Sequence, residues 1–222
     1  MITLKFIILL SIGTFMMLIP MLIQTRWYRL SYWKTIIISV LLTLSGTIGT
    51  YIWYSIETGG GSGGRSFYGA VFIVPLLFIP VAYLFRIPYA KLMDLCAPAE
   101  CMMLVLMKVL CFLEGCCGGR VLCVNAIGEA VRFPSQLAEL INAFVLCIVL
   151  LALSYKKERR GTIYPWYLVL YGATRFVLNF FRDVWQDTWM PMGTLWSICS
   201  IVTGVIALVI IKKKKNMQKE NI

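Results

Sequence analysis

Long apolar runs separated by short polar segments form the main pattern of the chain. A helix needs roughly 20 residues to cross a hydrocarbon core of about 30 Å, and seven runs come close to that length. We expect helices at residues 2–24, 35–56, 67–85, 97–113, 134–155, 163–181 and 191–211. The pattern predicts an all-α integral membrane protein, with one domain of seven transmembrane helices at residues 1–211 and a basic tail at residues 212–222.

Composition supports a membrane protein rather than a water-soluble one. Of the 222 residues, 60% are hydrophobic and 14% are charged, and the mean hydropathy is +0.82. A soluble domain usually carries roughly a quarter of charged residues. The chain therefore has too little polar surface to cover a water-soluble globule.

The net charge of +11 predicts an orientation in the membrane. If the N-terminus lies outside, the cytoplasmic parts are residues 24–34, 86–95, 156–162 and the tail from 212. These parts hold 14 basic and 3 acidic residues, so they carry the whole net charge. Short cytoplasmic loops attract Lys and Arg, so we expect the N-terminus outside and the C-terminus in the cytoplasm. The basic charge is then explained by orientation and by anionic headgroups, without nucleic acid as a partner.

The residue types present limit the possible chemistry. Histidine is absent, which removes the commonest general base and the commonest metal ligand. Any reaction must use Arg, Lys, Glu, Tyr or Cys, and we predict no metal and no cofactor. Most of the eight cysteines lie in apolar stretches, where cysteine behaves as a small hydrophobic residue.

Besides Lys5 in the first predicted helix, four charged side chains lie inside the predicted helices: Glu100, Lys108, Glu139 and Arg175. An ionisable group at membrane depth costs at least about 2.5 kcal/mol on insertion scales, so such a residue is a functional candidate by default. Two acids and two bases can also neutralise one another, as two interhelical ion pairs that stabilise the bundle. The sequence leaves both interpretations open.

Arginines concentrate toward the predicted outer face. Arg175 and Arg182 are seven residues apart, so on a helix they share one face with Asn179 between them. Three further arginines lie near the outer face: Arg65, Arg120 and Arg132. Because guanidinium groups bind phosphate through paired hydrogen bonds, we expect an anionic phospholipid headgroup as a partner.

Glycines and cysteines follow the fourth predicted helix, in the sequence E-G-C-C-G-G-R at residues 114–120. A glycine such as Gly119 lets backbone N–H groups approach a phosphate, although loop flexibility or close packing would also favour it. Cys116 and Cys117 have three interpretations: small packing residues, a redox or disulfide element, or a nucleophile activated by Lys108 or Arg120. Adjacent cysteines do not fit the spacing of a zinc site.

Six segments in order along the chain carry recognisable motifs. They are G-G-R-S-F-Y-G at 63–69, D-L-C-A-P at 94–98, K-V-L-C-F-L-E-G-C-C-G-G-R at 108–120, R-F-P-S-Q-L-A-E at 132–139, Y-G-A-T-R-F and F-F-R within 171–182, and M-G-T-L-W-S at 192–197. In this order they resemble the motifs of the prolipoprotein diacylglyceryl transferases, a bacterial family of seven-helix membrane enzymes. Tyr68 stands where that family has a histidine, Lys108 where it has its signature arginine, and Asn179 where it has a glutamate.

The resemblance implies a reaction and a set of site residues. The family transfers the diacylglyceryl group of phosphatidylglycerol to the thiol of a lipobox cysteine in a preprotein, without a metal, on the outer side of the bacterial inner membrane. The catalytic candidates are Arg175, Lys108, Tyr68 and Glu139. The candidates for substrate binding are Arg182, Arg120, Gly69, Gly119, Ser135, Gln136 and Tyr171. The alternative is an altered paralogue that binds or transports an anionic phospholipid without this transfer.

Overall fold

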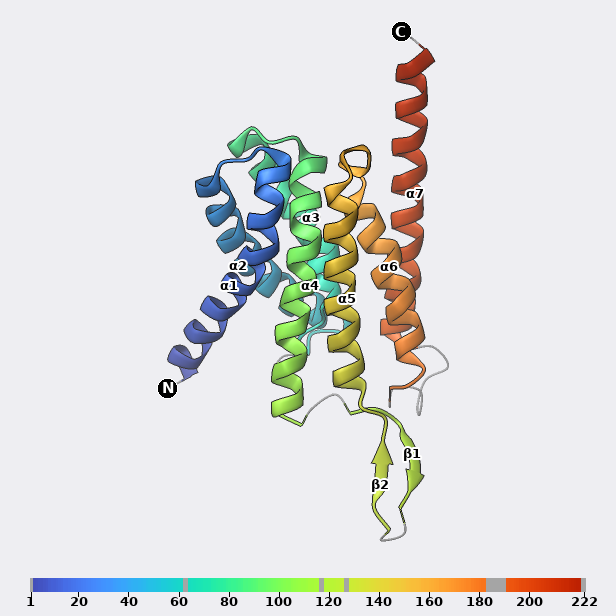
Figure 1. Cartoon of the computed structure of the whole chain (residues 1–222). Coiled ribbons are helices and arrows are strands. Elements are labelled where there is room, and N and C mark those ends of the chain that lie inside the picture. The colour runs from blue at the N-terminus through green and yellow to red at the C-terminus, as the bar shows by residue number, and fades with distance from the viewer. Residues whose placement is uncertain (1, 62–63, 116–117, 126–127, 183–190, 221–222) are drawn as a thin grey trace. The chain divides into compact units, whose positions relative to one another are not determined.

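The fold is helical apart from one small hairpin. The structure, a computed structural model, describes residues 2–61, 64–115, 118–125, 128–182 and 191–220. Within these ranges the elements are α1 (Ile2–Tyr28), α2 (Tyr32–Glu57), α3 (Tyr68–Phe85), α4 (Tyr89–Leu113), β1 (Val121–Val124), β2 (Ala130–Arg132), α5 (Ser135–Tyr155), the 3-10 helix η1 (Lys157–Arg159), α6 (Ile163–Asn179) and α7 (Met192–Glu220), as Figure 1 shows.

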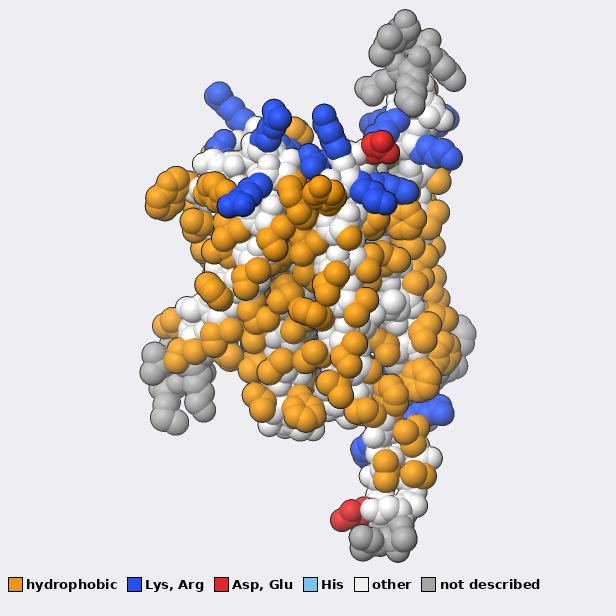
Figure 2. All heavy atoms as spheres, in the orientation of Figure 1, with side chains coloured by type: hydrophobic (Ala, Val, Ile, Leu, Met, Phe, Trp, Pro, Cys, Tyr) orange, Lys and Arg blue, Asp and Glu red, His pale blue; other side chains and the backbone are white. Residues whose placement is uncertain are grey.

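The helices confirm a multi-pass membrane protein. Six of those described, α1 to α5 and α7, are long and apolar enough to cross a membrane. Hydrophobic side chains cover most of the middle of the face shown in Figure 2, as expected where lipid tails are the solvent. The seventh expected helix exists as α6, the shortest of the described α-helices at 17 residues, so a seventh span stays a prediction. The basic run expected as a tail continues α7 as helix.

The chain divides into two compact units. The first comprises Met1–Met103 and Cys147–Tyr164, and the second comprises Leu104–Leu146 and Pro165–Ile222. The first unit contains α1 to α3, most of α4, the end of α5, η1 and the start of α6. The second contains the remainder of α4 to α6, the hairpin and α7.

In the first unit, α2 and α3 cross at a pair of glycines. A Cβ atom added to Gly49 would lie 2.8 Å from the carbonyl oxygen of Gly69, closer than real Cβ contacts. The two backbones can approach only because both residues are glycine. Gly69, a candidate for phosphate binding, therefore has a clear packing role between two helices.

This crossing gives a test with a matched control one helical turn away. Gly49→Ala is expected to lower the free energy of unfolding by about 1–3 kcal/mol, because the added methyl group overpacks a backbone contact. Gly46→Ala is expected to be neutral or stabilising, because its Cβ would make an ordinary contact 3.9 Å from Ala70 Cβ and alanine favours helix. Denaturant titration of the two variants in detergent micelles measures the difference, and equal stabilities would contradict the packing role.

The expected start of the fourth helix was wrong. Residues 86–95 were predicted to form a cytoplasmic loop, but α4 begins at Tyr89, and Asp94 lies inside the helix with none of its surface exposed. Its carboxylate accepts hydrogen bonds from Tyr28 Oη (2.9 Å) and from the backbone N–H groups of Gly161, Ile163 (2.9 Å) and Tyr164 (3.2 Å). These donors satisfy the charge, so a residue that favours a loop by composition lies within a buried helix.

In the second unit, the segment between α4 and α5 forms an antiparallel hairpin that was not expected. Val121 pairs with Arg132, and Val124 pairs with Ala130. The turn is fixed by Asn125, whose side-chain oxygen accepts a hydrogen bond from the Glu129 N–H (2.8 Å), and by Gly128 with a φ of 85°. Runs of valine and leucine around an asparagine and a glycine are a signal for such a hairpin, so the sequence did carry this information.

Candidate functional site

The second unit gathers three basic side chains around one carboxylate. Glu139, on α5, forms ion pairs with Lys108 of α4, Arg175 of α6 and Arg182, which follows α6. The Lys108 Nζ–Glu139 Oε2 distance is 2.7 Å, Arg175 Nη1 contacts the same oxygen, and Arg182 Nε lies 3.6 Å from Oε1. The Glu139 side chain is 4% exposed, against 10% for Lys108, 12% for Arg175 and 19% for Arg182. We call these four residues the Glu139 cluster.

The cluster differs from the two separate ion pairs that were one interpretation of the charges inside the helices. Glu139 instead forms ion pairs with three cations. Glu100 belongs to the first unit, where 1% of its surface is exposed. Three positive charges around one carboxylate leave a net charge of +2, and a group with excess positive charge away from water favours an anion as its further partner.

Arg175 and Arg182 both pair with Glu139, but the prediction that they share one face of the sixth helix was wrong. The helix was expected to run to residue 181, whereas α6 ends at Asn179. Asn179 is 1% exposed, and its Nδ2 donates to Thr194 Oγ1 (3.4 Å) at the start of α7. Arg182 is therefore not on the helix, and another element must position it.

The base of the hairpin positions Arg182. Gly119 and Arg182 form an antiparallel β-bridge, and the Arg120 N–H donates to the Phe181 carbonyl (3.0 Å). The rings of Phe133 and Phe181 stack with their centroids 4.9 Å apart. A Cβ atom at Gly119 would collide with the Phe133 carbonyl oxygen, so the close approach of these backbones requires glycine. The hairpin thus connects the position of Arg182 to the start of α5.

Several other predicted site residues also belong to the second unit. Ser135, 1% exposed, is the first residue of α5 and Gln136 is the second. Tyr171 lies one turn before Arg175, is 2% exposed, and stacks on Tyr167 with ring centroids 5.7 Å apart. Ser135 and Gln136 precede Glu139 on α5, and Tyr171 precedes Arg175 on α6.

Two expected members of the site, Arg120 and Tyr68, make other contacts. Arg120 is exposed, and its guanidinium lies 6.0 Å from the centre of the Phe181 ring. Tyr68 belongs to the first unit, where it is 4% exposed and stacks on Phe72, with centroids 6.1 Å apart. Cys116 and Cys117 lie outside the described residues, so their three interpretations stay open.

A polar pair next to the cluster was missed by the sequence analysis. Asn142 Nδ2 donates to Thr174 Oγ1 (3.1 Å) and joins α5 to α6 within the second unit. Asn142 lies three residues after Glu139, and Thr174 directly precedes Arg175. Residues three apart share a helix face, so the spacing from Glu139 was the signal that could have identified Asn142.

Fold and site together define a helical membrane protein with a buried cluster of net positive charge. Comparison with known proteins identifies the family. Residues 6–210 match the sequence model of the family described as prolipoprotein diacylglyceryl transferase, and the chain belongs to that family. The resemblance inferred from the six motifs is thereby confirmed.

Two curated relatives carry the name phosphatidylglycerol–prolipoprotein diacylglyceryl transferase. The protein of Geobacter sulfurreducens is 30% identical over 165 residues, which cover 69% of this chain and 64% of the relative. The protein of Francisella tularensis subsp. novicida is 29% identical over 206 residues, which cover 82% of this chain and 77% of the relative. The match to the Geobacter protein thus spans slightly less than two thirds of its length.

Proposed function

We propose that the protein transfers the diacylglyceryl group of phosphatidylglycerol to the cysteine thiol of a prolipoprotein. The observation that carries this proposal is the Glu139 cluster, in which three cations share one buried carboxylate. Membership of the family supports it, as do the names of the two relatives, which specify phosphatidylglycerol and prolipoprotein as substrates.

The charge of the cluster fits the charge change of this reaction. The thiol gives up its proton to the departing phosphate or to water, its sulfur bonds to the glycerol carbon that carries the phosphate, and the carbon–oxygen bond to that phosphate breaks. Glycerol phosphate leaves with the bonding electron pair, so a phosphodiester of charge −1 becomes a monoester of about −1.5 to −2 at neutral pH. Cations that hold the phosphate stabilise this product-like charge more than the substrate, which is the condition for lowering the barrier.

Each member of the cluster has a proposed role. Arg175 and Lys108 bind the phosphate and stabilise the leaving group, with Arg182 in support at the more exposed edge. Glu139 is held by three cations, so its role is to orient them. Tyr68 stands at the family's histidine position, and its role toward the thiol proton is proposed from the motif alone.

The proposed orientation places this reaction outside the inner membrane. Seven spans with the N-terminus outside put the end of α4, the hairpin and the start of α5 on the outer side, where the cluster lies along the chain. The concentration of basic residues at the opposite helix ends supports this orientation. Residues 1–211 then form the transmembrane domain, and the tail from 212 lies in the cytoplasm.

Complementation of a bacterial strain depleted of its own lipoprotein transferase tests the proposal. The unaltered chain is expected to restore growth and Arg175→Gln is not, with diacylglyceryl transfer to a lipobox peptide reduced at least about a hundredfold in isolated membranes. Arg175→Gln leaves Glu139 paired with Lys108 and Arg182, so the variant is expected to fold.

Arg65→Gln is the matched control. This arginine is exposed and donates from Nε to Tyr51 Oη (2.9 Å) in the first unit, whereas the Glu139 cluster belongs to the second unit. It is expected to support growth like the unaltered chain. Growth with Arg175→Gln would contradict the assigned role of Arg175. Absence of growth with a well-expressed, unaltered chain would contradict the transferase and favour the altered paralogue.

A further inference from the structure

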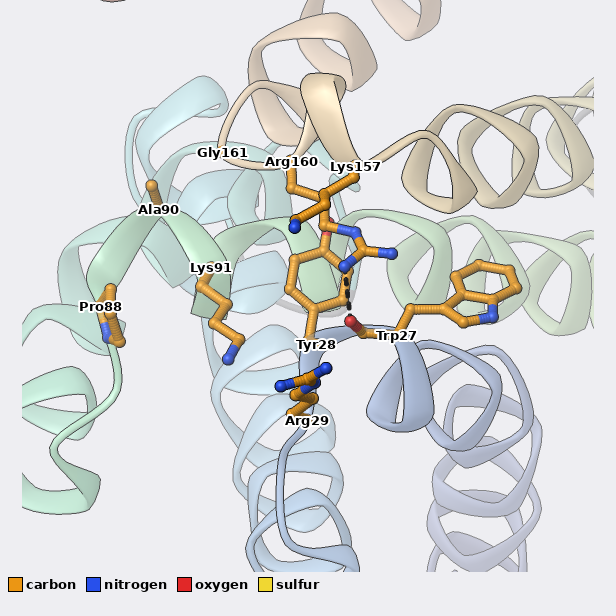
Figure 3. A pocket seen from close by; sticks show the side chains of 9 residues that line it. All are labelled: Trp27, Tyr28, Arg29, Pro88, Ala90, Lys91, Lys157, Arg160 and Gly161. Carbon is orange, nitrogen blue, oxygen red and sulfur yellow. Dashed lines mark hydrogen bonds between the residues drawn. The ribbon is translucent and has the colours of Figure 1, made fainter.

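A second basic region lies in the first unit, at the helix ends proposed to face the cytoplasm. A cavity of about 700 Å³ opens there among the junctions α1–α2, α3–α4 and α5–α6. It is lined by Trp27, Tyr28, Arg29, Pro88, Ala90, Lys91, Lys157, Arg160 and Gly161 (Figure 3). We call it the Tyr28 cavity, because the Tyr28 ring lies at its centre in this view.

The lining of the Tyr28 cavity is strongly positive. Four of the nine lining residues are Lys or Arg, and none is acidic. The carboxylate of Asp94 contacts two of the lining residues. It accepts hydrogen bonds from Tyr28 Oη and the Gly161 N–H, and it is fully buried. Four cations in the lining against this carboxylate leave the lining net positive around a concave space.

Part of this charge is held in place before any ligand binds. Arg160 donates to the backbone carbonyls of Trp27 (2.6 Å) and Ser154 (3.2 Å), and its guanidinium lies 5.3 Å from the centre of the Tyr28 ring. Lys91 Nζ lies 6.0 Å from the centre of the same ring. Figure 3 shows Arg160 and Lys91 reaching the Tyr28 ring from separate elements, with Arg29 next to Tyr28 in the chain.

The backbone conformation of Arg29 is a further observation at the cavity. Its φ of 51° is in the left-handed region, which at the end of a helix is normally taken by glycine. A long side chain at such a position has a conformational cost, and here that side chain lines the cavity. The general preference for basic cytoplasmic loops explains positive charge there, but it does not explain why cations from three junctions line one concave space.

We propose that the Tyr28 cavity binds a phosphate group, carried either by an anionic phospholipid headgroup or by a soluble phosphate ester. Cations at several points of a concave surface match the several oxygens of one phosphate. Basic pockets among transmembrane helix ends are known to accept lipid headgroups, and an aromatic ring beside them suits the membrane interface. This site is separate from the proposed transferase reaction and does not depend on it.

The test uses the full chain in phosphatidylcholine nanodiscs and two matched pairs of variants. Lys157→Gln changes a lining residue, and Lys156→Gln changes its exposed neighbour outside the lining. Arg29→Gln changes a lining residue, and Arg86→Gln changes an exposed arginine with nearly the same φ, 52°, at the end of α3. All four side chains are exposed, so these variants are expected to fold.

Two arms distinguish the sources of the phosphate. In one, glycerol 3-phosphate is titrated against the nanodiscs by calorimetry. In the other, phosphatidylglycerol is added to the nanodiscs and the lipid retained by the protein is counted by native mass spectrometry. The second unit is unchanged in every variant, so anion bound at the Glu139 cluster is common to all of them.

The expected result is weaker binding only for the lining variants, by about fivefold for each charge removed. This effect in the lipid arm identifies a headgroup, and in the soluble arm a free phosphate ester, and either outcome supports the site. Equal weakening by both members of each pair would show diffuse attraction and would overturn the proposal. Binding that none of the four substitutions changes would overturn it as well.

Discussion

Glu139→Ala is expected to lower the free energy of unfolding by about 3–5 kcal/mol, the usual cost of removing one partner from a buried ion pair. The loss leaves Lys108, Arg175 and Arg182 close together without the carboxylate that they share. Three like charges with mostly buried side chains then repel one another where little water is available to screen them. Denaturant titration of the purified protein in detergent micelles measures this loss.

A second substitution shows whether repulsion is the cause. Lys108→Met in the Glu139→Ala background removes one of the three cations, so it is expected to recover part of the lost stability, although Lys108→Met alone is expected to destabilise. A coupling energy of about 0.5–3 kcal/mol is typical of residues in one ion-pair network. Independent, additive effects of the two substitutions would contradict the cluster.

Glu129→Ala provides the matched control in the same unit. Glu129 is an exposed carboxylate at the hairpin turn, where its Oε2 accepts a hydrogen bond from Asn125 Nδ2 (3.2 Å). Its loss is expected to cost less than about 1 kcal/mol, as for other exposed polar contacts. A cost for Glu139→Ala as small as that for Glu129→Ala would show that the Glu139 cluster does not stabilise the second unit.

The sequence predicted the features that depend on local composition. Apolar length was sufficient to identify the helices, because the requirement to cross lipid applies to each helix separately. The cost of charge at membrane depth selected Glu100, Lys108, Glu139 and Arg175. The structure brings the last three together, whereas Glu100 belongs to the first unit. The roles of these residues in transfer stay predictions.

Features set by contacts distant in sequence were not predictable in the same way. The local sequence predicts a loop at Asp94, because the donors at residues 28 and 161–164 that satisfy it are distant in the chain. The local sequence predicts a helix at Arg182, whereas its backbone pairs with Gly119. In both cases a partner at least 60 residues away in the chain satisfies the group, and neither hydropathy nor local periodicity contains that information.

Asp94→Ala is expected to destabilise the first unit by about 3–5 kcal/mol, because the carboxylate is a buried charge whose removal leaves several donors without an acceptor. The backbone N–H groups of Ile163 and Tyr164 belong to the first turn of α6 and have no acceptor within that helix. The Tyr28 hydroxyl and the Gly161 N–H lose the same partner. Asp94 thus holds the start of α6 and the end of α1 against α4.

Two milder substitutions rank the contributions to this network. Tyr28→Phe removes one donor and keeps the ring. The free energy of unfolding is expected to fall by about 0.5–1.5 kcal/mol, the net value of one hydrogen bond, or somewhat more because the acceptor is charged.

Asp94→Asn keeps one oxygen that can accept hydrogen bonds. It replaces the other oxygen with an NH₂ group, which then faces the donors that this oxygen had bound. It is expected to fall between Tyr28→Phe and Asp94→Ala in denaturant titrations. Tyr28→Phe is also expected to lower the free energy of unfolding less in the Asp94→Asn background, because the Tyr28 hydroxyl that would face the new NH₂ group is then absent. An Asp94→Asn variant as stable as the unaltered chain would contradict this account, because hydrogen-bonding shape without charge would then be enough to hold α6.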